Sequence, residues 1–147
     1  MKKICCLNIL ILAVAILFAS CSKEDDHSEV SSPSETGFFY GENGTSALTK
    51  ADEAQANGQH KTIIAKKNNS TVVEIVLTDL KAGTYPLTAK YAFTYVKNGN
   101  HWESTAGTLT ITKNDGNKLS GTFKATAGAG VSGVSTVEGK FNDIPVK

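Results

Sequence analysis

The residues in front of one cysteine predict that this cysteine is modified by lipid. Cys21 follows Ala19 and Ser20, and two small residues at this place let a signal peptidase seat the backbone and cut between Ser20 and Cys21. One acyl chain anchors a protein only marginally, at about 0.8 kcal/mol per buried CH₂, whereas several chains, palmitate among them, make the attachment permanent. The spacing predicts a covalent lipid on Cys21 and no other cofactor.

Aromatic side chains alternate along one expected strand and open the next. Tyr91, Phe93 and Tyr95 share one face. Trp102 follows across the turn Asn98–Asn100. Such rings could form a platform for a sugar or a small apolar ligand. They could equally pack across the strands in the core, with the tyrosine hydroxyl groups at the rim.

No spacing in the chain predicts catalysis or a metal centre. No nucleophile elbow, zinc-binding histidine spacing or paired-carboxylate motif is present. His27 lies beside Asp25 and Asp26, but such groups in a polar segment are usually solvated. The run Asn114–Asn117 is similar to part of a calcium loop but lacks its terminal glutamate, and a hairpin turn explains it. We expect neither an enzyme nor a bound metal.

The charge composition argues against nucleic-acid binding. The chain has 15 basic residues, all of them lysine, against 14 acidic residues. Without arginine it lacks the planar donor group used for bidentate recognition of phosphates and base edges. Because the charge is nearly balanced, the chain has no overall electrostatic field that would attract nucleic acid or anionic lipid.

Residues 1–20 have the order of an export signal. Lys2 and Lys3 precede an apolar run from Ile4 to Ala19. An uncleaved anchor helix is the alternative, because the run is only slightly shorter than the roughly 17 to 25 residues that span a bilayer. In both cases the rest of the chain lies outside the cytoplasm. The other two cysteines fall within this leader, so Cys21 has no disulfide partner.

Residues 21–36 predict a flexible, acidic tether. From Ser22 to Thr36 the chain has one lysine, five acidic residues and five serines, and it is too polar to bury a core. Its negative charge repels anionic headgroups and keeps the tether extended. The string Ser22–Asp26 resembles the acidic signal that directs lipoproteins of Bacteroidota to the cell surface. We expect display on the outer membrane, with a periplasm-facing lipoprotein as the alternative.

Residues 37–147 predict one all-β domain. An alanine-rich patch at 47–57 is expected to form a short helix or an irregular edge. Thr71–Leu77 is rich in β-branched residues on both faces, which favours a central strand covered on both sides or lining a barrel wall. Further strands are expected at 83–97, 101–113, 118–127 and 131–141.

Turn residues separate these strands at hairpin spacing. Asn98–Asn100 and Asn114–Asn117 tolerate the positive φ that tight hairpins require. Alternation places Leu109 and Ile111 inward and their threonine neighbours outward. The run Phe38–Tyr40 is expected to seal one end of the domain. Short antiparallel strands without room for crossovers predict a β-sandwich or a partly closed β-barrel, lipocalin-like at most by analogy.

Four segments carry a family resemblance: Gly83–Tyr85, Gly107–Lys113, Leu119–Phe123 and Glu138–Phe141. In this order they resemble a family of small Bacteroidota lipoproteins built on an all-β domain of unknown function. The resemblance implies fold and location but no catalytic residue. Gly121, within the third segment, also suits a bulge where a sheet bends.

These expectations describe a lipid-anchored protein whose β domain is a binding or accessory module. Its partner would be a glycan, a small molecule or an envelope protein. The alternative is a structural or envelope-interaction lipoprotein without a small ligand, working through a sheet face and its threonines.

Overall fold

The computed structural model describes residues 35–90 and 92–147, which form an all-β domain. Its strands are, in chain order, β1 (Gly37–Glu42), β2 (Thr49–Lys50), β3 (Glu53–Asn57), β4 (Thr62–Lys67), β5 (Ser70–Val76), β6 (Gly83–Pro86), β7 (Phe93–Lys97), β8 (Asn100–Glu103), β9 (Ala106–Asn114), β10 (Lys118–Thr126) and β11 (Thr136–Pro145). The described ranges contain no helix that is long and apolar enough to cross a membrane.

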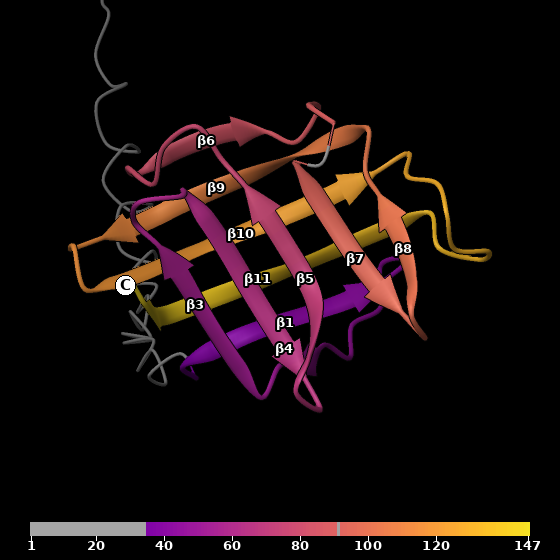
Figure 1. Ribbon diagram of the computed structural model, residues 1–147, viewed down its shortest axis with the longest axis horizontal. Helices are drawn as coiled ribbons and strands as arrows, with labels where there is room; N and C mark the ends of the chain where they lie inside the picture. Colours follow the sequence, from indigo (N-terminus) through magenta and orange to yellow (C-terminus); the bar gives the residue numbers. More distant parts are fainter. Residues whose placement is uncertain (1–34, 91) are drawn as a thin grey trace, which may run out of the picture. The chain divides into compact units, whose positions relative to one another are not determined.

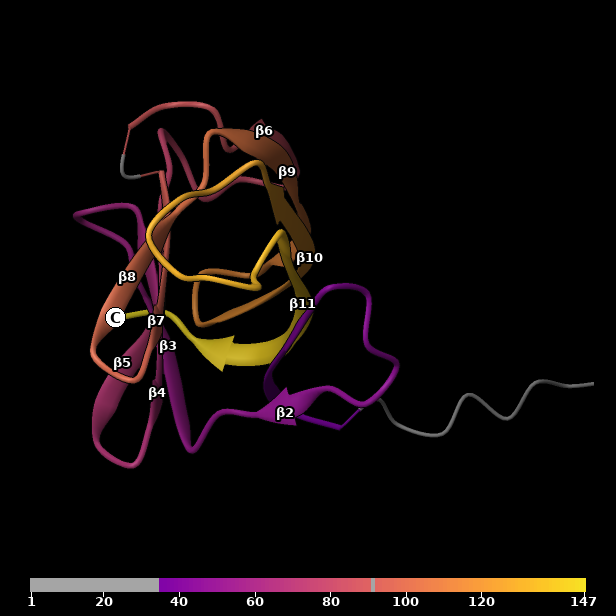
Figure 2. The same ribbon diagram turned by 90° about the vertical axis from the view of Figure 1, so that its right-hand side faces the viewer.

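The strands form two antiparallel sheets packed face to face. Sheet A has the order β2-β1-β11-β10-β9-β6, and sheet B has the order β3-β4-β5-β7-β8. Figure 1 shows the strands of sheet B crossing those of sheet A at a large angle, and Figure 2 shows the two layers from the side. The sheets do not close into a barrel. Of the two expected architectures, the β-sandwich is therefore the one observed.

The core lies between the sheets and is built around aromatic rings. The ring centroid of Phe123 on β10 lies 5.3 Å from that of Phe38 on β1 and 5.5 Å from that of Phe93 on β7. Because Phe93 belongs to sheet B, this cluster joins the two layers. Phe38 and Phe93 are completely buried, and burying such a side chain contributes about 1.5 to 3 kcal/mol. Phe38 therefore packs between the sheets and does not seal one end.

The alternation expected for β9, β10 and β11 is confirmed. Leu109 and Ile111 of β9 point into the core, while Thr108 before them is exposed. The two following strands repeat the pattern with the buried residues Leu119, Phe123, Ala125, Val137 and Phe141. The bulge expected near Gly121 is also present, because the register of β10 against β9 shifts between Ser120 and Gly121.

Both expected hairpin turns are confirmed. Asn98–Asn100 joins β7 to β8, and Asn114–Asn117 joins β9 to β10. In the second turn, Asp115 Oδ1 accepts hydrogen bonds from the backbone N–H groups of Asn117 at 3.0 Å and Lys118 at 2.7 Å. Its side chain thus satisfies the backbone of the turn, as aspartate commonly does.

Strand β5 lies at the centre of sheet B, as expected. Val73 and Ile75 are completely buried, whereas Val76 on the opposite face is 40% exposed. Neither expected alternative holds for this strand, because Val76 is exposed on its outer face and the sheets do not close into a barrel.

The alanine-rich patch forms edge strands, β2 in sheet A and β3 in sheet B, so of the two expected alternatives the helix is wrong and the edge position is observed. Residues 49–50 pair with β1, and residues 53–57 pair with β4. Ala54 and Ala56 pack toward the core while the polar residues between them point outward, which is the two-residue period of a strand. Strand pairing outweighs the helix propensity of alanine here.

Two expected strands are each divided between the sheets. The segment 83–97 contains β6 in sheet A and β7 in sheet B, and the segment 101–113 contains β8 in sheet B and β9 in sheet A. In orthogonal packing the chain changes layer at sharp corners, so one run of strand-forming residues need not be one strand. The last strand begins at Thr136, later than the expected Val131.

Ser104 joins the two sheets at the corner between β8 and β9. Its backbone N–H donates to the carbonyl oxygen of Phe93 in sheet B at 3.1 Å. Its hydroxyl group donates to the carbonyl oxygen of Ala106 at 2.6 Å and lies 3.1 Å from that of Thr126 in sheet A. Ser104 is 2% exposed. A hydroxyl group this deeply buried needs such partners, because leaving it unpaired costs stability.

At the corner between β2 and β3, two neighbouring residues bond to different sheets. The N–H of Ala51 donates to the carbonyl oxygen of Phe38 in sheet A at 2.8 Å. The N–H of Asp52 donates to the carbonyl oxygen of Lys66 in sheet B at 2.9 Å. Beyond this corner the edge of β3 faces the ends of β1 and β11.

Candidate functional site

The aromatic residues considered as a binding platform lie in the core. Phe93 and Trp102 are completely buried, and Tyr95 is 6% exposed. The rings of Phe93 and Trp102 meet edge to face with centroids 6.1 Å apart. Tyr91 lies outside the described residues. The core-packing interpretation therefore holds for the three described rings, which offer no exposed platform to a ligand.

A glycine-rich loop at 127–135, between β10 and β11, covers Trp102. The indole Nε1 donates a hydrogen bond of 3.0 Å to the carbonyl oxygen of Val134. Gly128 lies so close to the indole that a Cβ at this position would overlap it. Trp102 is hidden by the three-dimensional path of this loop, which no local sequence signal reveals.

Tyr95 ends in a polar cluster at the end of β1. Its hydroxyl group donates to Glu42 Oε1 at 2.6 Å, and Lys97 Nζ lies 2.7 Å from Glu42 Oε2. Burial raises the pKa of Tyr95, and the hydrogen bond to Glu42 raises it further. Burial alone would raise the pKa of Glu42, but the hydrogen bonds from Lys97 and Tyr95 bring it below its ordinary value. The cluster holds β1 against β7.

A groove of about 560 Å³ lies beside the edge of β3. It opens where this edge faces the ends of β1 and β11, and its lining includes Gly37, Lys50, Glu53, Gln55, Lys66 and Pro145. The corner at Ala51 bounds it at one end. At the other end, the N–H of Lys147 donates to the carbonyl oxygen of Ala56 at 2.9 Å. The volume lies within the range of small-molecule sites, about 300 to 1,000 Å³.

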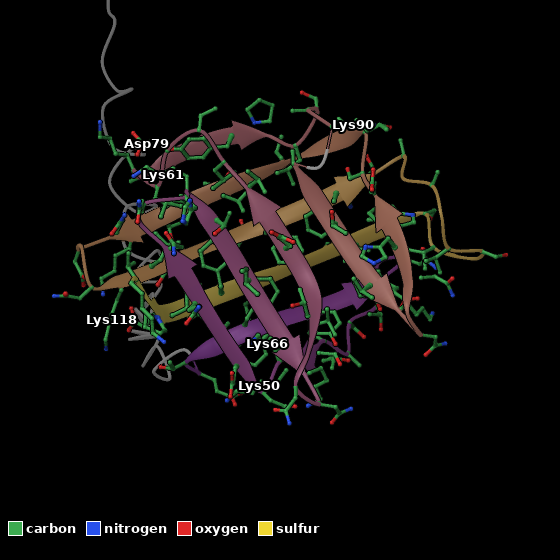
Figure 3. All side chains as sticks on the ribbon, viewed as in Figure 1. Lys50, Lys61, Lys66, Asp79, Lys90 and Lys118 are labelled. Carbon is green, nitrogen blue, oxygen red and sulfur yellow. The ribbon has the colours of Figure 1, made fainter. Side chains whose placement is uncertain are left out.

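Charged side chains of both signs line the groove. Glu53 and Lys66 are directly opposite each other on β3 and β4. Figure 3 shows Lys50 and Lys66 toward the same end of these strands. Asp52 is engaged by Lys67 at 2.6 Å, and this hydrogen bond lowers the pKa of Asp52. The groove thus offers ammonium and carboxylate groups to a polar ligand.

No metal centre accompanies these charges in the described ranges. No group of three histidine, cysteine, aspartate or glutamate side chains there could hold a metal ion. The candidate trio of His27, Asp25 and Asp26 lies outside the described residues. The same is true of Ser20 and Cys21, so the expected lipidation site is not described.

A second surface lies on the outer face of sheet A. The strand register aligns six residues in one line across the sheet, which we call the cross-sheet row: Thr84, Thr110, Thr122, Lys140, Phe39 and Lys50. The Oγ1 atoms of Thr84 and Thr110 lie 3.1 Å apart, within hydrogen-bond distance. The row spans about 24 Å, because neighbouring strands lie about 4.8 Å apart.

Two lysines of the cross-sheet row cover Phe39. The Nζ atoms of Lys50 and Lys140 each lie 5.6 Å from the centre of the Phe39 ring. An ammonium group is attracted to the negative face of such a ring. Phe39 is 7% exposed although it lies on the solvent-facing side of the sheet. The sequence did not predict this cluster, because it depends on the register among β2, β1 and β11.

The family model described as "Domain of unknown function (DUF6252)" matches residues 36–145. The chain belongs to the DUF6252 family. The matched residues run from the start of β1 to the end of β11, so the DUF6252 domain contains the whole cross-sheet row and nearly all of the groove. The expected membership in a family with a domain of unknown function is confirmed. No curated protein and no solved structure matches the chain.

Proposed function

We propose that this protein is a lipoprotein of the kind found in Bacteroidota, anchored to the outer membrane through Cys21 and displayed at the cell surface. Its DUF6252 domain acts as a binding module. The leader, the position of Cys21 behind Ala19 and Ser20, and the acidic tether support the anchor. The groove beside β3 is the observation that carries the binding role.

Three properties of the groove suit a small polar ligand. It is concave, it lies on strands of a rigid scaffold, and it combines apolar walls with a few charged groups. Pro145 and Ile144 line it together with Lys66 and Glu53. A ligand that carries both a carboxylate and a donor group would find partners of each kind.

A binding role is better supported than a catalytic one. Catalysis by a serine or cysteine nucleophile needs a base within hydrogen-bond reach. Within 35–90 and 92–147, no side chain of a histidine is hydrogen-bonded to a serine. Asp143 contacts Ser120 at 3.3 Å, but Lys113 occupies the same carboxylate oxygen at 3.0 Å. This contact supports the β-bulge at Ser120.

The anchor and its direction are tested on intact cells. Protease treatment of cells that make the protein is expected to digest the domain while a periplasmic marker stays intact. The Cys21→Ser variant is expected to lose the covalently attached lipid. A wild-type domain that stays protected while a known surface protein is cut would overturn surface display.

The groove is tested by nuclear magnetic resonance of the full-length protein, solubilised in detergent, against a library of small polar acids and amino acids. Ligand-induced shifts are expected to gather at residues 53–55 and 143–145. A Gln55→Trp substitution should fill the groove and abolish them. Thr94→Trp is the matched control, because Thr94 lies in the same cross-strand line of sheet B as Gln55 but outside the groove. Shifts that persist in Gln55→Trp would contradict the assignment.

The second candidate role is that of an envelope protein binding a partner protein through the threonines of sheet A. Protein interfaces usually have apolar or aromatic anchors at their centre. The one large apolar side chain found exposed among the described residues is Val76, which belongs to sheet B. This role therefore has less support than the binding of a small polar ligand.

A further inference from the structure

The cross-sheet row holds two ammonium groups beside one phenyl ring. Lys50 and Lys140 both lie 5.6 Å from the centre of one phenyl ring, so their Nζ atoms are no farther apart than twice this distance. The ring attracts both cations and so restricts where two long, flexible side chains place their charges. An anion that reaches this point meets a prearranged pair of cations on the face of a rigid sheet.

A carboxylate of the chain itself already occupies part of this position. Glu35 Oε1 lies 2.7 Å from Lys50 Nζ. The side chains of Lys50 and Glu35 are 48% and 66% exposed, so this is a surface ion pair that contributes little stability and can be exchanged. Lys140 has no carboxylate within ion-pair distance among the described residues. One lysine of the pair therefore already holds a carboxylate of the chain, and Lys140 is left to meet a carboxylate of a ligand.

Hydroxyl groups continue the row beyond the two lysines. Thr122 is the neighbour of Lys140, and Thr110 and Thr84 follow in register. Thr84 and Thr122 are exposed. Each hydroxyl group can donate one hydrogen bond and accept two, which matches the donor and acceptor pattern of sugar hydroxyl groups. Charge at one end and hydroxyl groups along about 24 Å suit a long, hydroxyl-rich, acidic molecule.

We infer that the cross-sheet row binds an acidic polysaccharide, with uronate carboxylates at Lys50 and Lys140 and sugar hydroxyl groups along Thr122, Thr110 and Thr84. Phe39 positions the two lysines and does not need to touch the sugar. The row is a surface separate from the groove, and Lys50 is the one residue that belongs to both. The absence of a large exposed apolar side chain from described sheet A favours a glycan over a protein partner.

The experiment measures binding of polygalacturonate to the full-length protein, solubilised in detergent, at low salt. Dextran serves as a neutral polysaccharide and polyglutamate as an acidic polymer without sugar hydroxyl groups. Polygalacturonate is expected to bind most tightly, polyglutamate more weakly, and dextran least. Lys140→Gln should weaken the binding of polygalacturonate about two- to five-fold, the size of one exposed ion pair. Thr122→Ala should weaken it as well.

Two variants separate a specific site from general charge attraction. Glu35→Gln removes the internal carboxylate and is expected to tighten the binding of polygalacturonate. Lys118→Gln is the matched control, because Lys118 is an exposed lysine of sheet A outside the row and changes the net charge by the same amount as Lys140→Gln. Lys118→Gln should bind as the wild type does. All these residues are on the surface, so thermal melting should confirm that each variant is folded.

Three results would overturn the inference. The first is equal affinity of Lys140→Gln and Lys118→Gln for polygalacturonate. The second is polyglutamate binding as tight as that of polygalacturonate. The third is loss of polygalacturonate binding in Gln55→Trp alone, which would place the glycan in the groove and leave the proposed binding function standing. If small acids and amino acids fail to bind in the groove while polygalacturonate still binds, the role of the groove is contradicted and the inference on the cross-sheet row stands.

Discussion

The indole Nε1 of Trp102 and the carbonyl oxygen of Val134 are joined by a hydrogen bond of 3.0 Å. This bond ties the loop 127–135 to β8, and the backbone of Gly128 lies against the same ring. The loop and the indole therefore form one packed unit at this end of the sandwich. A buried indole N–H requires such a partner, because leaving it unpaired is costly.

Gly128→Ala should destabilise the domain by about 1 to 3 kcal/mol, because the new methyl group overlaps the indole ring. Trp102 is the single tryptophan of the chain, so its fluorescence reports this site alone. We expect a red-shifted emission maximum and a lower urea midpoint. Ser132→Ala, an exposed change in the same loop, should alter neither quantity. An unchanged midpoint in Gly128→Ala would mean that the loop does not pack on Trp102.

Ser104→Ala should lower the free energy of unfolding by about 1 to 3 kcal/mol, because it removes the buried hydroxyl group that bonds to the carbonyl oxygens of Ala106 and Thr126 in sheet A. The neighbouring Thr105 also donates to a carbonyl oxygen, that of Ala127 at 2.6 Å, but it is exposed. Thr105→Ala should therefore cost less. Urea titration measures the free energy of unfolding of both variants. Equal decreases in Ser104→Ala and Thr105→Ala would contradict the role of Ser104.

Asn43 fixes the turn after β1 to the loop before β11. Its φ is +54°, its Oδ1 accepts from the N–H of Ser135 at 2.9 Å, and its Nδ2 donates to Gly133 O at 2.7 Å. Asn43→Gly keeps the backbone conformation and loses about 1 kcal/mol per hydrogen bond. Asn43→Ala should lose about 1 kcal/mol more, because of its Cβ. Hydrogen exchange of the Ser135 amide should become faster in both, and unchanged protection would refute the contact.

Glu42 makes the stability of the folded domain depend on pH in the acidic range. Its pKa lies below the ordinary value of 4.5 in the folded chain, so it contributes stability above that value which is lost as the pH falls through the lowered pKa. Glu42→Gln should melt at a lower temperature than the wild type at neutral pH, and the gap should narrow as the pH falls below about 4. Glu53→Gln, an exposed change, is the control. A gap that is independent of pH would show that the charge of Glu42 is not involved.

Local sequence patterns correctly predicted the strands and turns that depend only on residues close together in the sequence. The alternation of Leu109 and Ile111 with threonine, and the turns at Asn98–Asn100 and Asn114–Asn117, need only neighbouring residues. The corner at Ser104 has no such signal. A serine between strand-forming residues has the same local pattern whether the chain continues straight or changes sheet, and burial between two layers decides its role.

The candidate sites depend on residues that are far apart in the sequence. The groove exists because Gly37, Gln55 and Pro145 meet at one edge, and the cross-sheet row exists because β2, β1 and β11 pair in one register. One missed signal was available in the alanine-rich patch. Its alanines at 54 and 56 alternate with polar residues, which distinguishes a strand from a helix.

The anchor at Cys21 is tested most directly by the mass of the first peptide of the mature protein, extracted from the membranes of cells that make it. We expect this peptide to begin at Cys21 and to carry the mass of a thioether-linked lipid with further acyl chains. A first peptide that still contains residues from 1–20, or an unmodified Cys21 in membrane-bound protein, would contradict a lipid-anchored binding module.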